Sequence, residues 1–500
     1  MLPYISLSLV LWTLCVGVAG AADRRYIELS TAQLTLVSAS GEAETRQIAL
    51  RIEMFRAAVE LALGVSLPTA IHTRIYALSD RDWKKYAQPR PGVSGYFLSH
   101  PASSDLMFNI DDADARAFEL IFHEYVHHIL RTSWAGEVPP FLDEGLAEVL
   151  STARFDQGTV RLEPRLDYIR LLRHQDWLPF ERLLKIRRHD PEYVEHNLAP
   201  AFYAQAWATM YYAMAIDPAA GARTIAYFRD LQEGSDEVNA AERVVGTSDK
   251  DVNRAIAAFI RKRERLPIAQ LEVGSDVERG ESALRKLDHQ ESTLAIGELM
   301  LRFGNRHQKA RELFDEALRR EPENLRARVG AAWSQLQAGN WPQAATILDN
   351  AATTAEVDSA TSVALGRGLY QLVAATSETD PPGGEHRERL QRARAYFDSA
   401  MIYKRTRIEA ISGYVLASLA LGESDPALIV LAEVGYRSAP RSSDLAVALA
   451  ILHELGGKRD TARVYWHEAA RNTQTGPMRT RILNELQRTE EDPRQPVPDG

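Results

Sequence analysis

Helical and strand-like spacings of apolar residues alternate along the first half of the chain. Residues 41–64 carry apolar side chains every three or four positions, which predicts an amphipathic helix that ends at Gly64. Short alternating or β-rich stretches predict strands at 26–39, 72–79, 95–99 and 106–110, and a hairpin at 154–162. Helices are predicted at 115–131, at 140–152 and over most of 165–264. A mixed α and β region is therefore expected before about residue 266.

The second half of the chain repeats one helical pattern. Small residues recur at intervals of 34–35 positions, as in Gly304 and Gly339 or in Ala427 and Ala462. This period, with proline after the second helix of a unit, resembles tetratricopeptide (TPR) repeats over residues 289–490. A generic helical bundle is the alternative, but it does not require small residues to recur in phase.

These patterns divide the chain into five segments. Residues 1–22 have the layout of a secretory signal peptide, with an uncharged stretch and an A-x-A site at Ala19–Ala21. An exported, periplasmic or secreted protein is expected; the alternative is a membrane anchor at residues 4–21, which would apply if this segment is not cleaved. The remaining segments are a globular domain at 23–266, a linker at 267–288, the repeats at 289–490 and a disordered tail at 491–500.

Charge and cysteine content argue against a nucleic-acid partner and against thiol chemistry. A formal charge of −9 argues against a nucleic-acid partner, because such proteins usually present a basic face. The only cysteine is Cys15, so a mature protein that lacks the signal segment has no thiol for catalysis or for metal binding.

The stretch "AFELIFHEYVHHIL" (117–130) places charged groups in an apolar helix. Residues four apart lie about 40° apart around a helix axis, so His123 and His127 share a face and can bind one Zn²⁺ ion. Glu124 flanks that face, where it can take a proton from a water bound to the metal. His128 points elsewhere and is expected to be structural. The alternative, a helix with hydrogen-bonded core histidines, leaves two imidazoles and a carboxylate to be buried at a cost of several kcal/mol.

A second acidic motif follows in "PFLDEGLAEVL" (140–150). With H-E-x-x-H it resembles the gluzincin zinc metallopeptidases (the MA-like peptidases), in which a glutamate on the next helix is the third ligand. The resemblance implies an α+β zincin-like N-terminal domain, with a small mixed sheet and active-site helices, before the all-α TPR-type solenoid. It makes Glu144 the third ligand. Glu148 lies one helical turn later on the same face and is expected to accept a hydrogen bond from the far ring nitrogen of His123; Glu148 as the ligand is the alternative. Asp143 is expected to be a solvated acid at the helix start.

The resemblance implies two further features. Tyr203, in "APAFYAQAW" (199–207), is expected to stabilise the oxyanion, with His196 as the weaker choice and simple aromatic packing as the alternative. The strand at 105–110 is expected at the sheet edge, where it would pair with an extended peptide.

Two functions are weighed from these features. The first is a zinc peptidase that binds one Zn²⁺ and cleaves a peptide or protein substrate, while the concave face of the repeats recruits substrates or partners. A zinc hydrolase with a non-peptide substrate is a variant of it. The second is a TPR adaptor whose metal domain is structural or inactive. The presence of Glu124, which has no role in a closed structural site, favours the enzyme.

Overall fold

The computed structural model describes most of the chain beyond residue 24. The described residues are 25–64, 72–87, 93, 95–99, 103–111, 115–133, 138–156, 158–175, 177–195, 197–232, 249–262, 266–274, 282–303, 306–351, 357–377, 383–403, 406–473 and 477–491. The expected signal peptide and all but the first residue of the expected tail lie outside this part. Among the described residues, no helix is both long and apolar enough to span a membrane.

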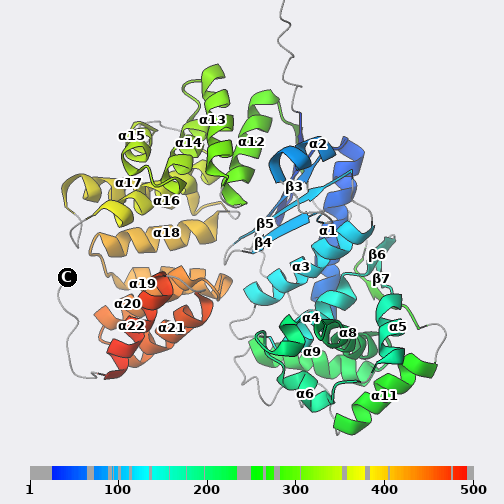
Figure 1. The fold of residues 1–500 in the computed structure, drawn as a ribbon. Helices are drawn as coiled ribbons and strands as arrows, with labels where there is room; N and C mark the ends of the chain where they lie inside the picture. Colours follow the sequence, from blue (N-terminus) through cyan, green and yellow to red (C-terminus); the bar gives the residue numbers. More distant parts are fainter. Residues whose placement is uncertain are drawn as a thin grey trace, which may run out of the picture.

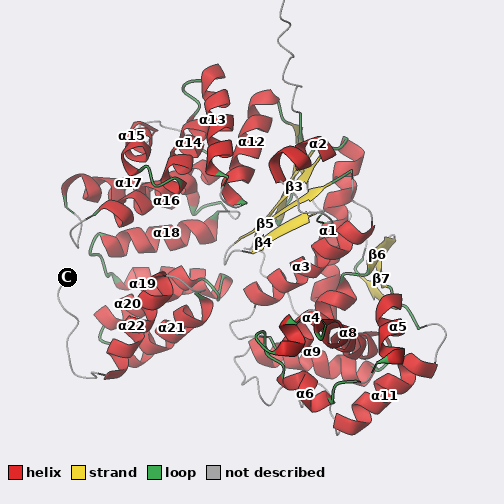
Figure 2. Ribbon diagram, in the orientation of Figure 1, coloured by secondary structure: helices red, strands yellow, loops and turns green. Residues whose placement is uncertain are grey.

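A six-stranded mixed sheet forms the centre of the N-terminal half, and a three-stranded sheet lies beside it (Figure 2). The larger sheet has the order β4-β5-β3-β2-β1-β9, and the smaller one has the order β6-β7-β8. The strands are β1 (Ile27–Ser30), β2 (Leu34–Ser38), β3 (His72–Leu78), β4 (Gly95–Ser99), β5 (Ser103–Asn109), β6 (Ala153–Asp156), β7 (Thr159–Leu162), β8 (Ala269–Glu272) and β9 (Ala283–Lys286). Strands β2, β3 and β5 run parallel, and β4 and β9 pair antiparallel to their neighbours.

Helices surround the sheets and then form the repeat array. Those of the first half are α1 (Glu42–Leu63), α2 (Asp80–Asp82), the π-helical turn η1 (Trp83–Ala87), α3 (Ala115–Ser133), α4 (Pro140–Leu150), α5 (Leu166–His174), α6 (Phe180–Lys185), α7 (Pro191–Val194), α8 (Ala199–Ala215), α9 (Pro218–Gln232) and α11 (Asp249–Lys262). Those of the second half are α12 (His289–Arg302), α13 (His307–Arg320), α14 (Leu325–Gln337), α15 (Trp341–Ala351), α16 (Ser359–Thr376), α17 (Gly384–Ala400), α18 (Arg407–Ala420), α19 (Pro426–Ser438), α20 (Ser443–Leu455), α21 (Arg459–Asn472) and α22 (Pro477–Glu491). Within the described residues, the helices and strands predicted from the sequence occur, and the stretch 26–39 forms two strands, β1 and β2.

Two corrections concern the sheets. The strand predicted at 105–110 is β5, and it is not an edge strand, because β4 pairs with its outer side. The edge on that side of the sheet is therefore β4. The segment 267–288, predicted as a linker, contributes β8 to the smaller sheet and β9 to the larger one. The folded N-terminal region consequently continues to about residue 286.

The helices of the second half pack as antiparallel pairs with a recurring contact. Phe314 on α13 lies so close to Gly297 on α12 and Gly330 on α14 that a Cβ at either glycine would be less than 3 Å from its ring. Phe397 on α17 has the same relation to Gly366 on α16 and Gly413 on α18. Glycines of the first helices are therefore the sites where an aromatic ring of the second helix in a pair inserts between successive first helices.

The repeat array shares a hydrophobic core with the sheet. Along β3, Ile75 and Ala77 face the core formed with α1 and α3, whereas Tyr76 and Leu78 face a second core that includes Leu299 and other residues of α12–α14. Figure 1 shows the repeat helices on one side of the sheet and α1 and α3 on the other. The two halves are thus packed together and are not separate domains on a linker.

Buried charges reinforce this junction. Asp105 of β5 is fully buried, and its carboxylate pairs with Arg74 of β3 at 2.9 Å and with Arg302 of α12 at 3.4 Å. Farther along the array, Glu409 of α18 accepts a hydrogen bond from the Ser103 hydroxyl at 3.2 Å and lies 3.8 Å from Arg74. The sheet therefore contacts the first helices of two different repeat pairs.

Replacing Asp105 with Asn should destabilise the whole protein. The substitution leaves two guanidinium groups near a buried, uncharged amide, and breaking a buried ion pair in this way costs about 3 kcal/mol or more. Urea unfolding should show a lower midpoint for Asp105→Asn. Glu181→Gln is the control, because Glu181 pairs with Lys185 at the exposed surface, where an ion pair adds little to stability. Equal midpoints for Asp105→Asn and wild type would contradict this role.

Candidate metal centre

Helices α3 and α4 bring three ligand atoms of the predicted site together. His123 Nε2 lies 3.1 Å from His127 Nε2, and Glu144 Oε2 lies 3.5 Å from the first and 3.3 Å from the second. A tetrahedral zinc ion with ligands at about 2.0–2.1 Å holds neighbouring ligand atoms about 3.3 Å apart. Within the described residues, these three side chains are the one group of histidine, cysteine or acidic residues with metal-binding proximity. Two imidazoles and one carboxylate in this arrangement fit zinc.

Local packing fixes the helix that carries Glu144. Helix α4 begins with Pro140 at its first turn, and every one of its residues is buried. A Cβ at Gly145 would lie 2.6 Å from the backbone oxygen of Ala206 and 2.7 Å from the side chain of Met210, both on α8. Glycine therefore allows α4 and α8 to cross in direct contact next to Glu144.

Asp143 corrects a prediction. It was expected to be solvated at the helix start, but it is 1 % exposed, and its Oδ1 lies 2.6 Å from Nδ1 of His127. Its other oxygen accepts a hydrogen bond from Arg188. This carboxylate orients the ring of His127 so that Nε2 points toward His123 and Glu144, which is the usual arrangement behind a metal-binding histidine.

Glu148 lies near the other ligand histidine. Its Oε1 is 3.7 Å from Nδ1 of His123, and its Oε2 is 2.8 Å from the guanidinium of Arg165. The separation from His123 exceeds a direct hydrogen bond. Glu144, not Glu148, has the oxygen that faces both Nε2 atoms, so the structure favours Glu144 as the third ligand.

The charges of the cluster shift its proton affinities strongly. Burial disfavours the imidazolium, but hydrogen bonds and negative charge from Asp143 and Glu144 outweigh burial and raise the pKa of His127 to about 10. Burial raises the pKa of Glu144, yet the two imidazoles and Tyr193 hold that pKa well below its ordinary value. With these shifts, His127 keeps its second proton and Glu144 stays ionised at neutral pH when no metal is bound.

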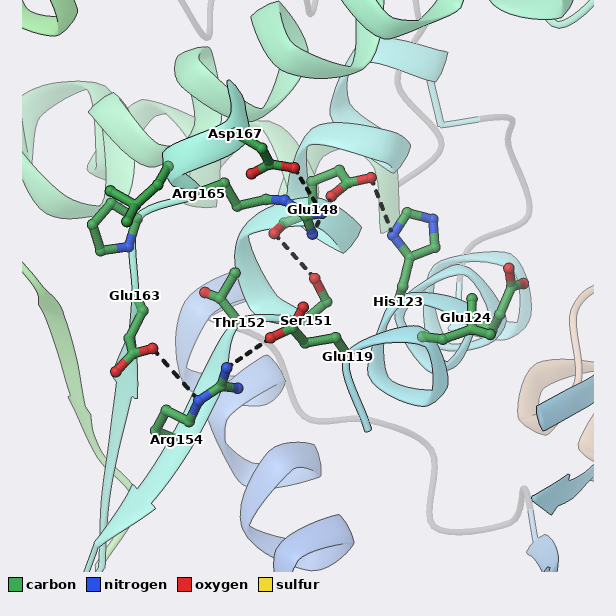
Figure 3. A pocket seen from close by; sticks show the side chains of 13 residues that line it. Glu119, His123, Glu124, Glu148, Ser151, Thr152, Arg154, Glu163, Arg165 and Asp167 are labelled. Carbon is green, nitrogen blue, oxygen red and sulfur yellow. Dashed lines mark hydrogen bonds and ion pairs between the residues drawn. The ribbon is translucent and has the colours of Figure 1, made fainter. Parts of the chain in front are cut away.

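Glu124 and His123 line a cavity of about 810 Å³ (Figure 3). In this view His123 stands between Glu148 and Glu124, with Arg154 and Arg165 in the opposite wall. Glu124 is half-buried. It therefore lies at the border of this cavity, beside the ligand candidate His123.

Tyr203 lies near a second opening of about 490 Å³, which His123 and Glu148 also line. Burial and the charges of Glu144 and Glu148 raise the pKa of Tyr203 to about 12. His196, the other residue considered for the oxyanion, lies outside the described residues. His128 is buried against the rings of Phe97 and Tyr125 and does not belong to the ligand group.

The sequence analysis missed Arg188 and Tyr193. The hydroxyl of Tyr193 donates to Oε1 of Glu144 at 2.5 Å. Both residues lie more than forty positions beyond the residues they contact, in a segment with no recognisable motif. No local pattern in one sequence could have identified them.

Comparisons with known proteins bear on the repeats. A tetratricopeptide repeat model matches residues 304–360, and no curated protein matches the chain. The C-terminal region therefore contains TPR repeats. None of these comparisons supports a peptidase domain.

Similar solved structures are TPR-containing or helical proteins with low scores. "YrrB: a TPR protein with an unusual peptide-binding site" is 15% identical, covers 39% of this chain and 91% of its own, and has a TM-score of 0.29. Pseudomonas aeruginosa PilF is 18% identical, covers 40% of this chain and 86% of its own, and has a TM-score of 0.30. Yeast Tom70 is 12% identical, covers 89% of this chain and 84% of its own, and has a TM-score of 0.29. Similarities at this level say nothing about function here.

Zinc binding should release a proton from His127. With a pKa of about 10, the imidazole is protonated at pH 8 in the metal-free protein, and it must be neutral to bind a metal. Calorimetry in buffers with different ionisation enthalpies should detect about one proton released per zinc at pH 8, and less as the pH rises past about 10. Asp143→Asn should reduce this release, because it removes a charge that retains the proton. Zinc binding without proton release at pH 8 would contradict this electrostatic picture.

Gly145→Ala should weaken both stability and zinc binding. The new methyl group meets a backbone oxygen that cannot rotate away, so α4 and α8 must separate and displace Glu144. Overpacking of this kind costs about 1–3 kcal/mol, measurable by urea unfolding. Gly41→Ala is the matched control, since a Cβ there has no neighbour within 4 Å. Wild-type stability and zinc affinity in Gly145→Ala would show that this close crossing is unnecessary.

Proposed function

We propose that the N-terminal half is a zinc-dependent peptidase and that the TPR repeats hold or recruit its protein substrates or partners. One observation carries the catalytic part of the proposal. Three ligand atoms from two motifs lie 3.1–3.5 Å apart, and one of these residues, His123, lines a cavity that Glu124 also lines. A closed structural site would need neither the cavity nor Glu124.

His123, His127 and Glu144 would hold the ion. When bound, zinc would supply Lewis acidity that polarises a substrate carbonyl and makes a water molecule a stronger acid. Asp143 keeps the ring of His127 in the orientation that presents Nε2 to the ion.

Glu124 is proposed as the general base. Its carboxylate accepts the proton of the attacking water and returns a proton to the leaving amine. Tyr203 is proposed to donate a hydrogen bond to the oxygen that becomes negative. Its raised pKa, about 12, keeps the hydroxyl protonated at neutral pH, so it remains a donor.

An adaptor without catalytic activity is the second candidate function. The repeat match favours it, because TPR arrays bind proteins on extended surfaces and this match is the part supported by known proteins. The peptidase proposal rests instead on the geometry of the ligand group. The packing of β3 and β5 against α12 and α18 also means that part of the surface expected to take a partner contacts the protein's own sheet.

Glu124→Gln separates the two functions. The amide cannot accept a proton, so hydrolysis of an unfolded protein substrate should fall roughly 100- to 10,000-fold, while the zinc content stays at one ion. The exposed Glu181→Gln variant should retain full activity. Proteolysis that is equal in wild type and Glu124→Gln would sink the peptidase proposal, and zinc binding without any proteolysis would favour the adaptor.

A further inference from the structure

The short segment between α6 and α8 contacts two carboxylates of α4, those of Asp143 and Glu144. Tyr193 on α7 donates its hydroxyl to Oε1 of Glu144 at 2.5 Å, leaving Oε2 to face the two histidines. Arg188, in the loop before α7, donates one nitrogen to Asp143 and another to the hydroxyl oxygen of Tyr193 at 3.1 Å. Arg188 thus contacts both Asp143, the partner of His127, and Tyr193, the partner of Glu144.

This segment is itself anchored on two sides. Arg182 of α6 makes a bidentate pair with Glu192 of α7, with distances of 2.8 and 2.7 Å. On the other side, the ring of Tyr193 packs against Phe202 and Tyr203 of α8, with centroids 5.7 and 6.1 Å away. The hydroxyl of Tyr193 is therefore held in place from two helices before it reaches Glu144.

We infer that Arg188 and Tyr193 are positioning residues that complete the metal site. Tyr193 occupies one oxygen of Glu144, so that the carboxylate offers the ion a single oxygen. Arg188 holds Asp143 against His127 and Tyr193 against Glu144, and thereby couples the orientation of two ligands. The inference rests on the proposed zinc site, but it concerns how tightly and with what geometry the ion is held, independently of whether peptides are cleaved.

Metal affinity tests this inference in the full-length protein. Tyr193→Phe and Arg188→Met should each weaken zinc binding roughly 10- to 100-fold in titration calorimetry, the usual effect of removing an outer partner of a ligand. Arg187→Met and Tyr212→Phe are matched controls: Arg187 is the exposed neighbouring arginine, and Tyr212 packs on Phe259. Both controls should bind zinc as tightly as wild type.

Two additional readouts separate positioning from a general structural effect. Because Arg188 donates to Tyr193, the double variant should lose less affinity than the product of the two single losses. In cobalt-loaded protein, Tyr193→Phe frees the second oxygen of Glu144, so the coordination number should rise and the visible absorption should weaken. Arg187→Met should leave the cobalt spectrum unchanged.

The possible failures are distinct. Wild-type zinc affinity in both Tyr193→Phe and Arg188→Met overturns the inference. If Arg188→Met does not fold, Arg188→Lys replaces it. Lysine retains the charge but has a single nitrogen in place of the two that contact Asp143 and Tyr193, so a partial loss of zinc affinity is expected. Tight zinc binding without proteolysis would end the peptidase proposal and leave this inference standing, whereas a wild-type protein that binds no zinc overturns both.

Discussion

The need to bury two imidazoles and two carboxylates in one small volume shapes the N-terminal half of this protein. His127, Asp143 and Glu144 are nearly inaccessible to solvent, and His123 is the ligand that remains open to the cavity. Burying such groups without partners costs several kcal/mol, so each needs a hydrogen bond or an ion. Asp143, Tyr193 and Arg188 supply partners on the outer side. Nε2 of His123, Nε2 of His127 and Oε2 of Glu144 face one another on the inner side, where a bound metal ion would be their common partner.

The larger sheet supports the helix that carries His123 and His127. One face of the sheet packs on α1 and α3, and α3 carries both histidines. The other face packs on the first repeat helices. Asp105 ties β3 and β5 to α12, and Glu409 of α18 contacts the same strands. The TPR repeats consequently pack against the sheet behind the candidate metal centre. A partner that docks on the array would do so at a fixed position relative to the cavity.

Local sequence patterns predicted the helices and strands, but not every strand pairing or every contact between residues distant in sequence. The helical spacing of His123 and His127, and the glutamate of the next helix, predicted that His123, His127 and Glu144 lie close together, and the structure brings them together. The burial of Asp143 depends on Arg188, which is distant in sequence, and the edge position of β4 depends on the order in which strands pair. The linker between 267 and 288 was misjudged for a similar reason, since strands as short as β8 and β9 are defined by their partners.

The most direct test of the account is the X-ray absorption fine structure of the zinc-loaded protein at the zinc edge. The account predicts two imidazole nitrogens and one carboxylate oxygen among ligands at about 2.0–2.1 Å, with the multiple-scattering signature of two histidine rings. The same measurement on Glu144→Gln should show loss of an oxygen ligand or a longer bond to oxygen. A shell of water oxygens without imidazole scattering in the wild-type protein would contradict the proposal that α3 and α4 build a metal site.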